Sequence, residues 1–120
     1  MVRAFLSCGT GNPGHLRPVA VDGICPAAVL TAQIARPDAT VAALAGDGGF
    51  AMPAMEFATA VQHDLPVIVL VCSNGLLGEE AAKQSRAGLP VYGMKLHNPD
   101  WAAFARAAGG SDGTRKTSGS

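Results

Sequence analysis

Two apolar runs dominate the hydrophobic pattern of this chain. The first covers residues 40–45 (Thr-Val-Ala-Ala-Leu-Ala) and the second covers residues 66–72 (Pro-Val-Ile-Val-Leu-Val-Cys). Continuous runs of this length are typical of strands that helices cover on both faces. Between them, residues 53–63 carry apolar positions at helical spacing, which predicts a helix. Its buried stripe would comprise Met55, Ala58, Val61 and Leu65. Strand, crossover helix and strand form one βαβ unit, so we expect the two strands to be parallel.

Three other segments have the pattern of helices. Residues 26–35 contain no glycine, and Pro37 ends this segment because a proline disfavours helical geometry in the residue before it. Residues 79–86 are rich in charged and polar side chains, as a solvated helix face is. Near the end of the chain, Asn98 can cap a helix that has Pro99 in its first turn. The buried stripe of this last helix would comprise Trp101, Phe104, Ala105 and Ala108.

Two polar residues of the βαβ unit follow the ends of its strands. Asp47 lies just past the carboxyl end of the first strand, and Asn74 lies just past that of the second. Because the carboxyl ends of parallel strands meet at one edge of a sheet, with neighbouring strands about 5 Å apart, both side chains can reach one cation. Mg²⁺ suits such a site, since it takes one or two carboxylate or carbonyl oxygens and fills its other positions with phosphate and water.

Three glycines, Gly46, Gly48 and Gly49, surround Asp47. They allow the backbone to approach a ligand closely. The helix that follows offers unpaired N–H groups to an anion. A metal ion with a bound diphosphate is therefore one interpretation of this turn. The alternative is that glycine and aspartate occupy a strand-to-helix turn for its geometry alone.

The spacing of these residues resembles a known cofactor motif. Gly46-Asp47-Gly48, followed after twenty-five residues by Asn74, resembles the thiamine-diphosphate motif, which begins with GDG and closes with an asparagine. Three further segments are similar to the diphosphate-binding domain of the acetolactate synthase and 2-oxo acid decarboxylase group: residues 35–41, 46–50 and 56–66. Residues 98–105 resemble the start of a later helix in that domain. The likeness extends from about Ile24 to Gly110.

This resemblance implies a fold, two cofactors and a set of ligands. The fold would be α/β, an open parallel sheet flanked by helices, present here in part. The cofactors would be thiamine diphosphate and Mg²⁺. The Mg²⁺ would be held by the side chains of Asp47 and Asn74 and by the backbone carbonyl of Leu76. The cofactor would also contact Gly46, Gly48 and Gly49, of which the last two would face its diphosphate.

The chain departs from the family pattern at several positions. Val21-Asp22 stand where the family has a bulky apolar residue that wedges the cofactor into a bent shape. Leu77 stands where the family usually has an aromatic residue, and Ser73 replaces a common asparagine. The family's catalytic glutamate comes from a different domain, often of a different subunit, so Glu56 is not that residue. We interpret Glu56 as a first-turn acid that the helix dipole favours.

Composition excludes several classes of protein. The 120 residues are 48% hydrophobic and 15% charged, which indicates one folded globular domain. The positive and negative side chains balance to a formal net charge of zero, so there is no basic excess for nucleic-acid binding. No apolar stretch is long enough to span a membrane. Three cysteines without CxxC spacing indicate reduced thiols in a cytoplasmic protein.

Glycine and proline content divides the chain into three parts. Residues 1–23 are predicted to form a Gly/Pro-rich N-terminal loop, residues 24–110 a partial diphosphate-binding α/β domain, and residues 111–120 a disordered tail. Gly9-Thr10-Gly11 lacks the lysine of a phosphate loop. The family domain continues with another strand and helix, so we expect this chain to be truncated relative to it.

Two hypotheses of different classes follow. In the first, the chain is the cofactor-binding part of a 2-oxo acid decarboxylase or carboligase similar to acetolactate synthase. A pyrimidine-binding domain or subunit would then supply the missing glutamate, within a homo-oligomer or hetero-oligomer. In the second, the chain is a non-catalytic truncated remnant, or a small α/β domain without independent activity. An unrelated nucleotide-binding protein is a weaker alternative, because neither GxGxxG nor a Walker lysine is present.

Overall fold

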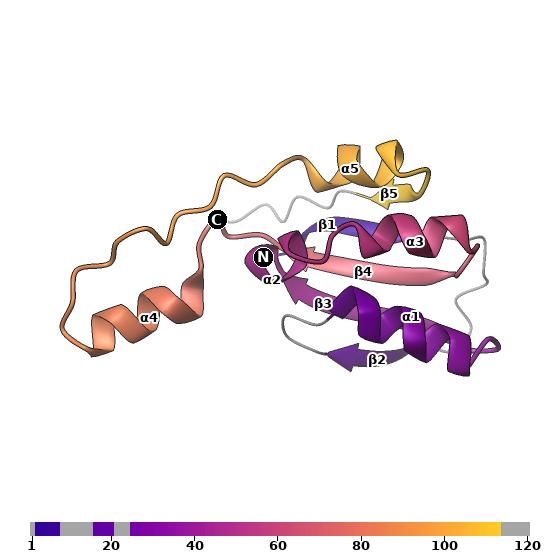
Figure 1. The fold of residues 1–120 in the computed structure, drawn as a ribbon, viewed down its shortest axis with the longest axis horizontal. Coiled ribbons are helices and arrows are strands. Elements are labelled where there is room, and N and C mark those ends of the chain that lie inside the picture. The colour runs from indigo at the N-terminus through magenta and orange to yellow at the C-terminus, as the bar shows by residue number, and fades with distance from the viewer. Residues whose placement is uncertain (1, 8–15, 21–24, 114–120) are drawn as a thin grey trace.

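A computed structural model describes residues 2–7, 16–20 and 25–113 of the chain. In this part, helices line one face of a five-stranded sheet, and a helical segment extends away from one end of it (Figure 1). In chain order the elements are β1 (Val2–Ser7), β2 (Leu16–Ala20), α1 (Cys25–Ala35), β3 (Thr40–Gly46), α2 (Asp47–Ala51), α3 (Glu56–Gln62), β4 (Val67–Cys72), α4 (Gly78–Arg86), α5 (Trp101–Ala107) and β5 (Ser111–Gly113).

The sheet has a parallel half and an antiparallel edge. Its strand order is β2-β3-β4-β1-β5. Strands β2, β3 and β4 run parallel, whereas β1 is antiparallel to both β4 and β5. In the register of β3 and β4, Val41 lies opposite Val67 and Gly46 lies opposite Cys72. The predicted parallel βαβ unit is therefore confirmed, as is the α/β class with a parallel sheet flanked by helices. The carboxyl ends of β3 and β4 lie side by side.

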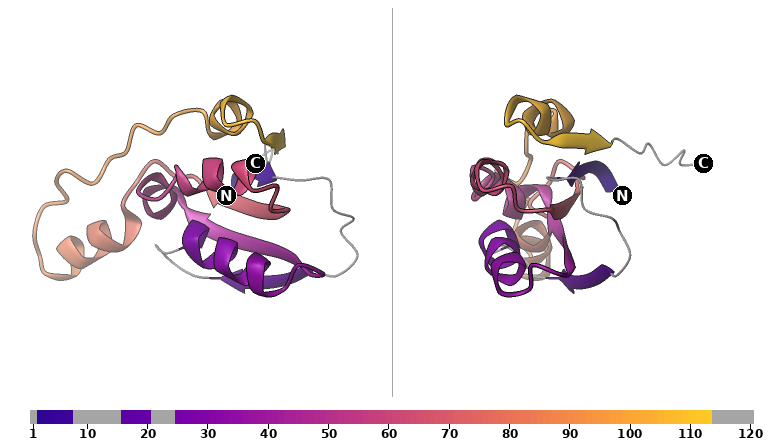
Figure 2. Two further views of the ribbon diagram at one scale, coloured as in Figure 1. Left: turned by 45° about the vertical axis from the view of Figure 1, so that its right-hand side comes forward. Right: turned by 90° about the vertical axis from the view of Figure 1, so that its right-hand side faces the viewer.

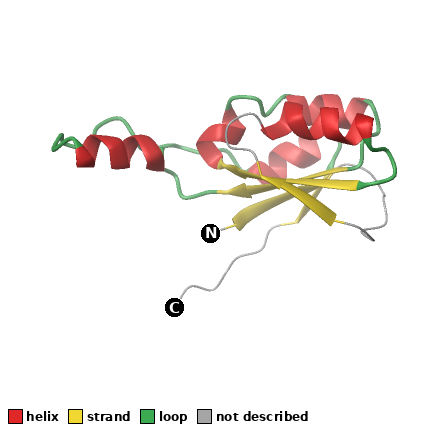
Figure 3. Ribbon diagram, turned by 90° about the horizontal axis from the view of Figure 1, so that it is seen from below, coloured by secondary structure: helices red, strands yellow, loops and turns green. Residues whose placement is uncertain are grey.

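The described helices cover one face of the sheet and not both. Helices α1, α2, α3 and α5 lie on the same side of the strands in Figure 3, and Figure 2 gives the same arrangement from two further directions. The side chains of β4 that face the helices are buried, and these are Val67, Val69 and Val71. The side chains on the opposite face are partly exposed, and these are Ile68, Leu70 and Cys72. The expectation of helices on both faces is wrong for the described residues. A continuous apolar run indicates that both faces of a strand are apolar, but it does not indicate which element packs against each face.

An aromatic cluster joins α2, α3 and α5 above the sheet. Phe50 of α2 is fully buried, and its ring packs edge-on against Trp101 of α5 with ring centroids 4.9 Å apart. Phe104 lies 6.3 Å from Phe50 and 6.3 Å from Phe57 of α3. The predicted buried stripe of α5 is confirmed. Because Asp47 is in the same short helix as Phe50, this cluster also holds Asp47 in place.

The connection between β3 and β4 contains two helices where the sequence predicts one. The predicted helix covers residues 53–63, whereas α2 already begins at Asp47 and α3 begins only at Glu56. Pro53 lies in the turn between them and has no backbone N–H to donate. Across that turn the N–H of Glu56 donates to the carbonyl of Pro53, three residues back. The turn that contains the proline therefore separates α2 from α3, and the helix predicted from residue 53 begins three residues later.

The late start of α3 changes its buried face. Its buried residues are Phe57 and Ala60, while Val61 and Leu65 pack partly buried against the core. Met55 precedes the helix and is 70% exposed, so its predicted place in the buried stripe is wrong. The helical spacing was correct for part of the stripe, but the position of the first turn decides which residues face the sheet.

Regular structure extends further toward both termini than the sequence predicts. The predicted loop over residues 1–23 is wrong for β1 and β2, and the predicted disorder of residues 111–120 is wrong for β5. These strands gain backbone partners on β3, β4 and each other, which local composition does not reveal. An ion pair of 2.7 Å between Arg106 Nη1 and Asp112 Oδ2 also ties β5 to α5. Residues 9–11 and 21–22 lie outside the described residues.

A buried amide aligns α1 with β3. Gln33 is 1% exposed, and its Nε2 donates to the carbonyls of Arg36 at 3.2 Å and Ala39 at 2.9 Å. Its Oε1 accepts from the backbone N–H of Val41 at 3.3 Å. The helix predicted over residues 26–35 is confirmed as α1 and ends before Pro37. None of the described helices is long and apolar enough to cross a membrane.

Candidate functional site

The pairing of β3 with β4 brings Asp47 and Asn74 to one edge of the sheet. Gly46 and Cys72, the last residues of the two strands, are register partners. Asp47 follows the first directly, and Asn74 follows the second by two residues. The backbone N–H of Asn74 donates to Asp47 Oδ2 at 3.2 Å. The two residues are in contact, as the strand topology predicts, although the contact uses the backbone of Asn74 and not its side chain.

One oxygen of the Asp47 carboxylate is surrounded by hydrogen-bond donors. Asp47 is 3% exposed. Its Oδ2 accepts from the backbone N–H groups of Gly75 at 2.7 Å and Asn74 at 3.2 Å. It also accepts from Ser73 Oγ at 3.3 Å and from Asn98 Nδ2. This buried carboxylate is therefore oriented by four donors, three of them in consecutive residues after β4.

The other oxygen is less occupied, and the carboxylate is ionised. Among the described residues, Oδ1 accepts one hydrogen bond, from the backbone N–H of Gly48 at 3.0 Å. Burial raises the pKa of Asp47, but the hydrogen bonds, led by that of the Gly75 N–H, outweigh burial and hold this pKa below its ordinary value of 3.8. At neutral pH, Asp47 is thus a fixed negative charge with one oxygen available to a cation.

Asn74 and Leu76 present further oxygen atoms beside Asp47. The exposed side chain of Asn74 accepts the backbone N–H of Leu76 at its Oδ1, at 2.9 Å, and so closes a local turn. Leu76 bridges to Lys95 across the neighbouring segment, and no described residue donates a hydrogen bond to its carbonyl. No group of three or more His, Cys, Asp and Glu suited to a metal occurs among the described residues. The oxygen atoms that could hold a cation at the strand ends are those of the Asp47 carboxylate, the Asn74 amide and the Leu76 carbonyl.

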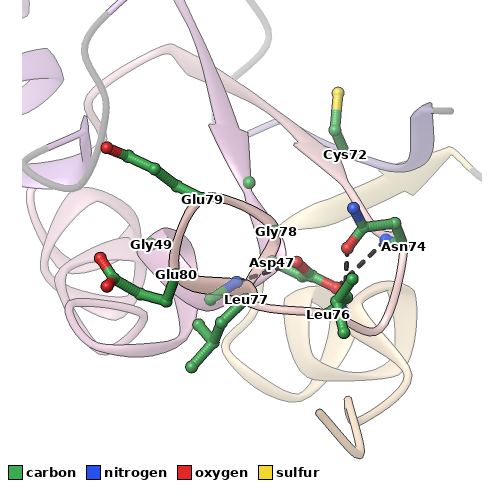
Figure 4. A pocket seen from close by; sticks show the side chains of 11 residues that line it. Asp47, Gly49, Cys72, Asn74, Leu76, Leu77, Gly78, Glu79 and Glu80 are labelled. Atoms are coloured by element: carbon green, nitrogen blue, oxygen red, sulfur yellow. Dashed lines mark hydrogen bonds between the residues drawn. The ribbon is translucent and has the colours of Figure 1, made fainter. Parts of the chain in front are cut away.

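A pocket of about 340 Å³ opens at this edge of the sheet. Figure 4 shows its lining, which contains all six residues that the sequence points to: Gly46, Asp47, Gly48, Gly49, Asn74 and Leu76. Cys72, Leu77 and the first turn of α4 complete the wall. Glu79 and Glu80 of that turn are exposed and both pair with Lys83, as the predicted solvated helix face requires. The first turn of α4 therefore borders both the solvent and the pocket.

The glycines around Asp47 have different surroundings. A Cβ atom added to Gly46 would meet nothing within 4 Å, so this strand end leaves open space. A Cβ atom added to Gly48 would lie 2.5 Å from Leu77 Cδ2 and 3.3 Å from Leu96 Cδ1. The space beside Gly48 is therefore filled by two leucine side chains. Gly49 is half-buried and lines the pocket.

Residues 75–97, which we call the arm, leave the sheet and return to it. The arm contains α4 and stands away from the other helices in Figure 1. Its two ends are joined by backbone hydrogen bonds of 2.8 Å, from the N–H of Leu77 to the carbonyl of Met94 and from the N–H of Leu96 to the carbonyl of Gly75. Gly75 adopts a left-handed conformation with φ of 70°, which a glycine takes without strain. The base of the arm thus forms one wall of the pocket.

Sequence reasoning missed the roles of Ser73 and Asn98. The prediction that Asn98 caps the last helix is wrong, because the cap of α5 is Asp100, whose carboxylate accepts from the N–H groups of Ala102 and Ala103. Asn98 instead donates its Nδ2 to Asp47 Oδ2 and to Ser73 Oγ. The local sequence Asn-Pro-Asp fits either assignment, so no local signal could have decided it. Val21-Asp22 lie outside the described residues.

Comparison with known proteins identifies relatives of this site and fold. The profile of thiamine pyrophosphate enzymes, C-terminal TPP binding domain, matches residues 19–119. The chain is 38% identical over 79 residues to a probable acetolactate synthase large subunit of Methanocaldococcus jannaschii, a match that covers 65% of this chain and 12% of the relative. It is 36% identical over 80 residues to sulfoacetaldehyde acetyltransferase of Alcaligenes xylosoxydans xylosoxydans, covering 67% of this chain and 12% of the relative. It is 38% identical over 88 residues to 2-hydroxyacyl-CoA lyase of Oryza sativa subsp. japonica, covering 72% of this chain and 14% of the relative.

The family match includes β3, α2, β4 and the arm, which together form the pocket. The chain spans only 12–14% of the length of these three relatives. The match covers most of the chain, and the parallel βαβ unit carries the GDG turn and the asparagine at adjacent strand ends. The chain therefore belongs to the thiamine pyrophosphate enzymes, within their C-terminal TPP binding domain.

Proposed function

We propose that this chain binds thiamine diphosphate together with Mg²⁺, as the cofactor-binding part of a 2-oxo acid decarboxylase or carboligase of the acetolactate synthase kind. The main support for a metal requirement is the negative charge of the pocket. Its described lining includes three carboxylates, Asp47, Glu79 and Glu80, and no Lys, Arg or His. Lys83 pairs with both glutamates and offsets one of these three charges, so the local charge stays negative. A negative charge repels a diphosphate unless a divalent cation lies between them.

The oxygen atoms at the strand ends suit Mg²⁺. Asp47 would bind the ion through its side chain, and the less occupied Oδ1 supports this role. The exposed amide of Asn74 and the carbonyl of Leu76 would provide two further oxygens. Mg²⁺ prefers such hard oxygen ligands and fills its remaining positions with phosphate and water. The donor set therefore fits this ion and a bound diphosphate.

The glycine turn would make room for the diphosphate. Gly46 has open space where a side chain would stand, and it lines the pocket with Gly48 and Gly49. Part of the space at Gly48 is taken by Leu77, so we assign closest approach to the side of Gly46 and Gly49. The resemblance to the family instead implies that Gly48 and Gly49 face the diphosphate, so the proposal replaces Gly48 by Gly46 as the position of closest approach.

The reaction class follows from the cofactor and the relatives. Thiamine diphosphate supplies an electron sink for breaking or making a bond next to a 2-oxo acid carbonyl. The relatives named as a probable acetolactate synthase and a 2-hydroxyacyl-CoA lyase support this class. The residues of this chain would hold the metal and the diphosphate. A pyrimidine-binding domain or subunit, in a cytoplasmic homo-oligomer or hetero-oligomer, would supply the catalytic glutamate.

Calorimetric titration of the purified chain with thiamine diphosphate, with and without Mg²⁺, tests this proposal. We expect binding only when Mg²⁺ is present. Asn74→Ala should weaken it by at least about 10-fold, because loss of even an outer-shell partner of a metal costs about 10–100-fold. Asp47→Ala is a poorer probe, since each donor left unpaired around Oδ2 would cost about 1–3 kcal/mol of folding free energy.

Gln84→Ala is the matched control for Asn74→Ala. The Gln84 amide belongs to the same arm but does not line the pocket, and it bonds the backbone of Tyr92 at 3.0 Å and 3.3 Å. This variant should bind the cofactor as the unmodified chain does. Equal affinity with and without Mg²⁺ would contradict the metal site. Absence of binding in both conditions would favour the second hypothesis, a remnant without cofactor.

A further inference from the structure

Asn98 and Asp47 are 51 residues apart in sequence and meet at the pocket. Asn98 is not engaged in capping α5, because Asp100 bonds both N–H groups at the start of that helix, at 2.9 Å and 3.1 Å. Its Nδ2 instead donates to Asp47 Oδ2 and, at 2.9 Å, to Ser73 Oγ. Ser73 is buried and donates to the same carboxylate oxygen. The amide of Asn98 thus completes a closed network of side chains around one oxygen.

The same oxygen accepts hydrogen bonds from the first residue of the arm and from the residue that follows the arm. The arm begins at Gly75, whose N–H donates to Asp47 Oδ2 at 2.7 Å, and it ends immediately before Asn98. Near its far end, the side chain of Leu96 lies against Gly48, where a Cβ atom would be 3.3 Å from Leu96 Cδ1. The start of the arm is fixed by backbone donors, which any sequence would supply. The returning end is joined to the start by the backbone bonds of Met94 and Leu96, and the side chain of Asn98 ties it to the carboxylate itself.

We propose that Asn98 is a positioning residue for the metal site. It holds the Asp47 carboxylate with Oδ2 saturated, which leaves Oδ1 for the cation. It also fastens the returning end of the arm to that carboxylate, so that a cation on Asp47 and the order of the arm are coupled. This inference rests on the proposed role of Asp47 as a Mg²⁺ ligand. The charge-assisted hydrogen bond from an amide to a carboxylate is the physical basis of the coupling.

Asp100→Ala separates positioning from a purely structural role. Asp100 lies two residues from Asn98, and its loss removes the cap of α5 but no donor to Asp47. It should lower the unfolding temperature and leave metal binding unchanged. Asn98→Ala removes the donor to Asp47 but no cap. If Asn98 mattered only for holding α5 in place, the two variants would behave alike.

The assay uses Mn²⁺ as the probe, with thiamine diphosphate present and free Mn²⁺ followed by electron paramagnetic resonance. We expect Asn98→Ala to raise the half-saturating Mn²⁺ concentration by about 10–100-fold, the usual cost of losing an outer-shell partner. Ser73→Ala removes a longer hydrogen bond to the same oxygen and should raise it less. Ser73→Ala also serves as the test if Asn98→Ala does not fold.

Limited trypsin digestion provides a second readout of the coupling. Arg86 and Lys95 are exposed cleavage sites within the arm. Mn²⁺ with thiamine diphosphate should slow cleavage there in the unmodified chain and in Asp100→Ala, but not in Asn98→Ala. If Asn98→Ala retains both affinity and protection while the unmodified chain binds Mn²⁺, the inference is overturned and the proposed function stands. If the unmodified chain does not bind Mn²⁺, both are overturned.

Discussion

Adding one methyl group at Gly46 or at Gly48 tests which of these glycines serves the ligand and which serves packing. Both line the pocket, and they lie on either side of Asp47. The backbone of Gly46 has φ of −71° and ψ of 156°, which alanine adopts freely, and a Cβ atom there meets nothing within 4 Å. At Gly48 the added Cβ atom would lie 2.5 Å from Leu77 Cδ2. The two substitutions therefore add the same methyl group, in one case to open space and in the other to a packed position.

The expected stabilities follow from these surroundings. Replacing a glycine by alanine at an allowed conformation stabilises a protein by about 0.4–1 kcal/mol, because the unfolded chain loses freedom, so Gly46→Ala should be slightly more stable. Overpacking by a methyl group costs about 1–3 kcal/mol. Gly48→Ala should therefore be destabilised by overpacking. This loss is reduced by up to about 1 kcal/mol, because alanine has a higher helix propensity than glycine. The half-buried Leu77 side chain moves more easily than backbone would, which favours the lower part of this range. The two variants should differ by about 0.4–3 kcal/mol in the free energy of unfolding.

Urea unfolding followed by circular dichroism measures this difference, and calorimetry measures cofactor binding on the same samples. We expect Gly46→Ala to be the more stable variant and yet to bind Mg²⁺ and thiamine diphosphate more weakly, because its methyl group enters the pocket. Leu77→Ala should be less costly in the Gly48→Ala background than alone, with a coupling of about 0.5–3 kcal/mol. Equal stabilities of the two glycine variants, together with no coupling to Leu77, would refute the assignment of Gly48 to packing.

Two further predictions concern the buried polar groups. Gln33→Met keeps the size of the side chain but removes its hydrogen bonds to the Ala39 carbonyl and the Val41 N–H, while the Arg36 carbonyl keeps the N–H of Ala39 as a donor. The lost bonds should cost about 2–4 kcal/mol in urea unfolding. The exposed Gln62→Met is the control, and an equal cost in both would contradict the role of Gln33 in aligning β3. The folded pKa of Asp47 lies below 3.8, so its ionised form contributes stability above the unfolded pKa, and this contribution is lost as the pH falls through the folded pKa. The unfolding temperature should therefore drop on acidification below about pH 4, and less steeply in Asp47→Asn. Parallel curves for the two proteins would show that Asp47 does not carry this pH dependence.

Much of the site could be predicted from sequence because its signals are local. The apolar runs before Asp47 and Asn74 identify strands, and the crossover helix between them makes those strands parallel. Parallel neighbouring strands then place the two residues at one edge without further information. The GDG turn and the spacing to Asn74 likewise depend only on short stretches of chain, and these carried the resemblance that the family match bears out.

Tertiary structure alone decided which residues complete the site and how the sheet is built. The donation from Asn98 to Asp47 joins residues that no periodic pattern relates, and the local sequence suited a helix cap equally well. Strands β1 and β5 form because their backbone groups find partners elsewhere in the sheet, and the helices cover one face of it for the same non-local reason. Hydrophobic periodicity determines which faces are apolar. Contacts between distant segments determine what lies against each face and which donors surround a buried charge.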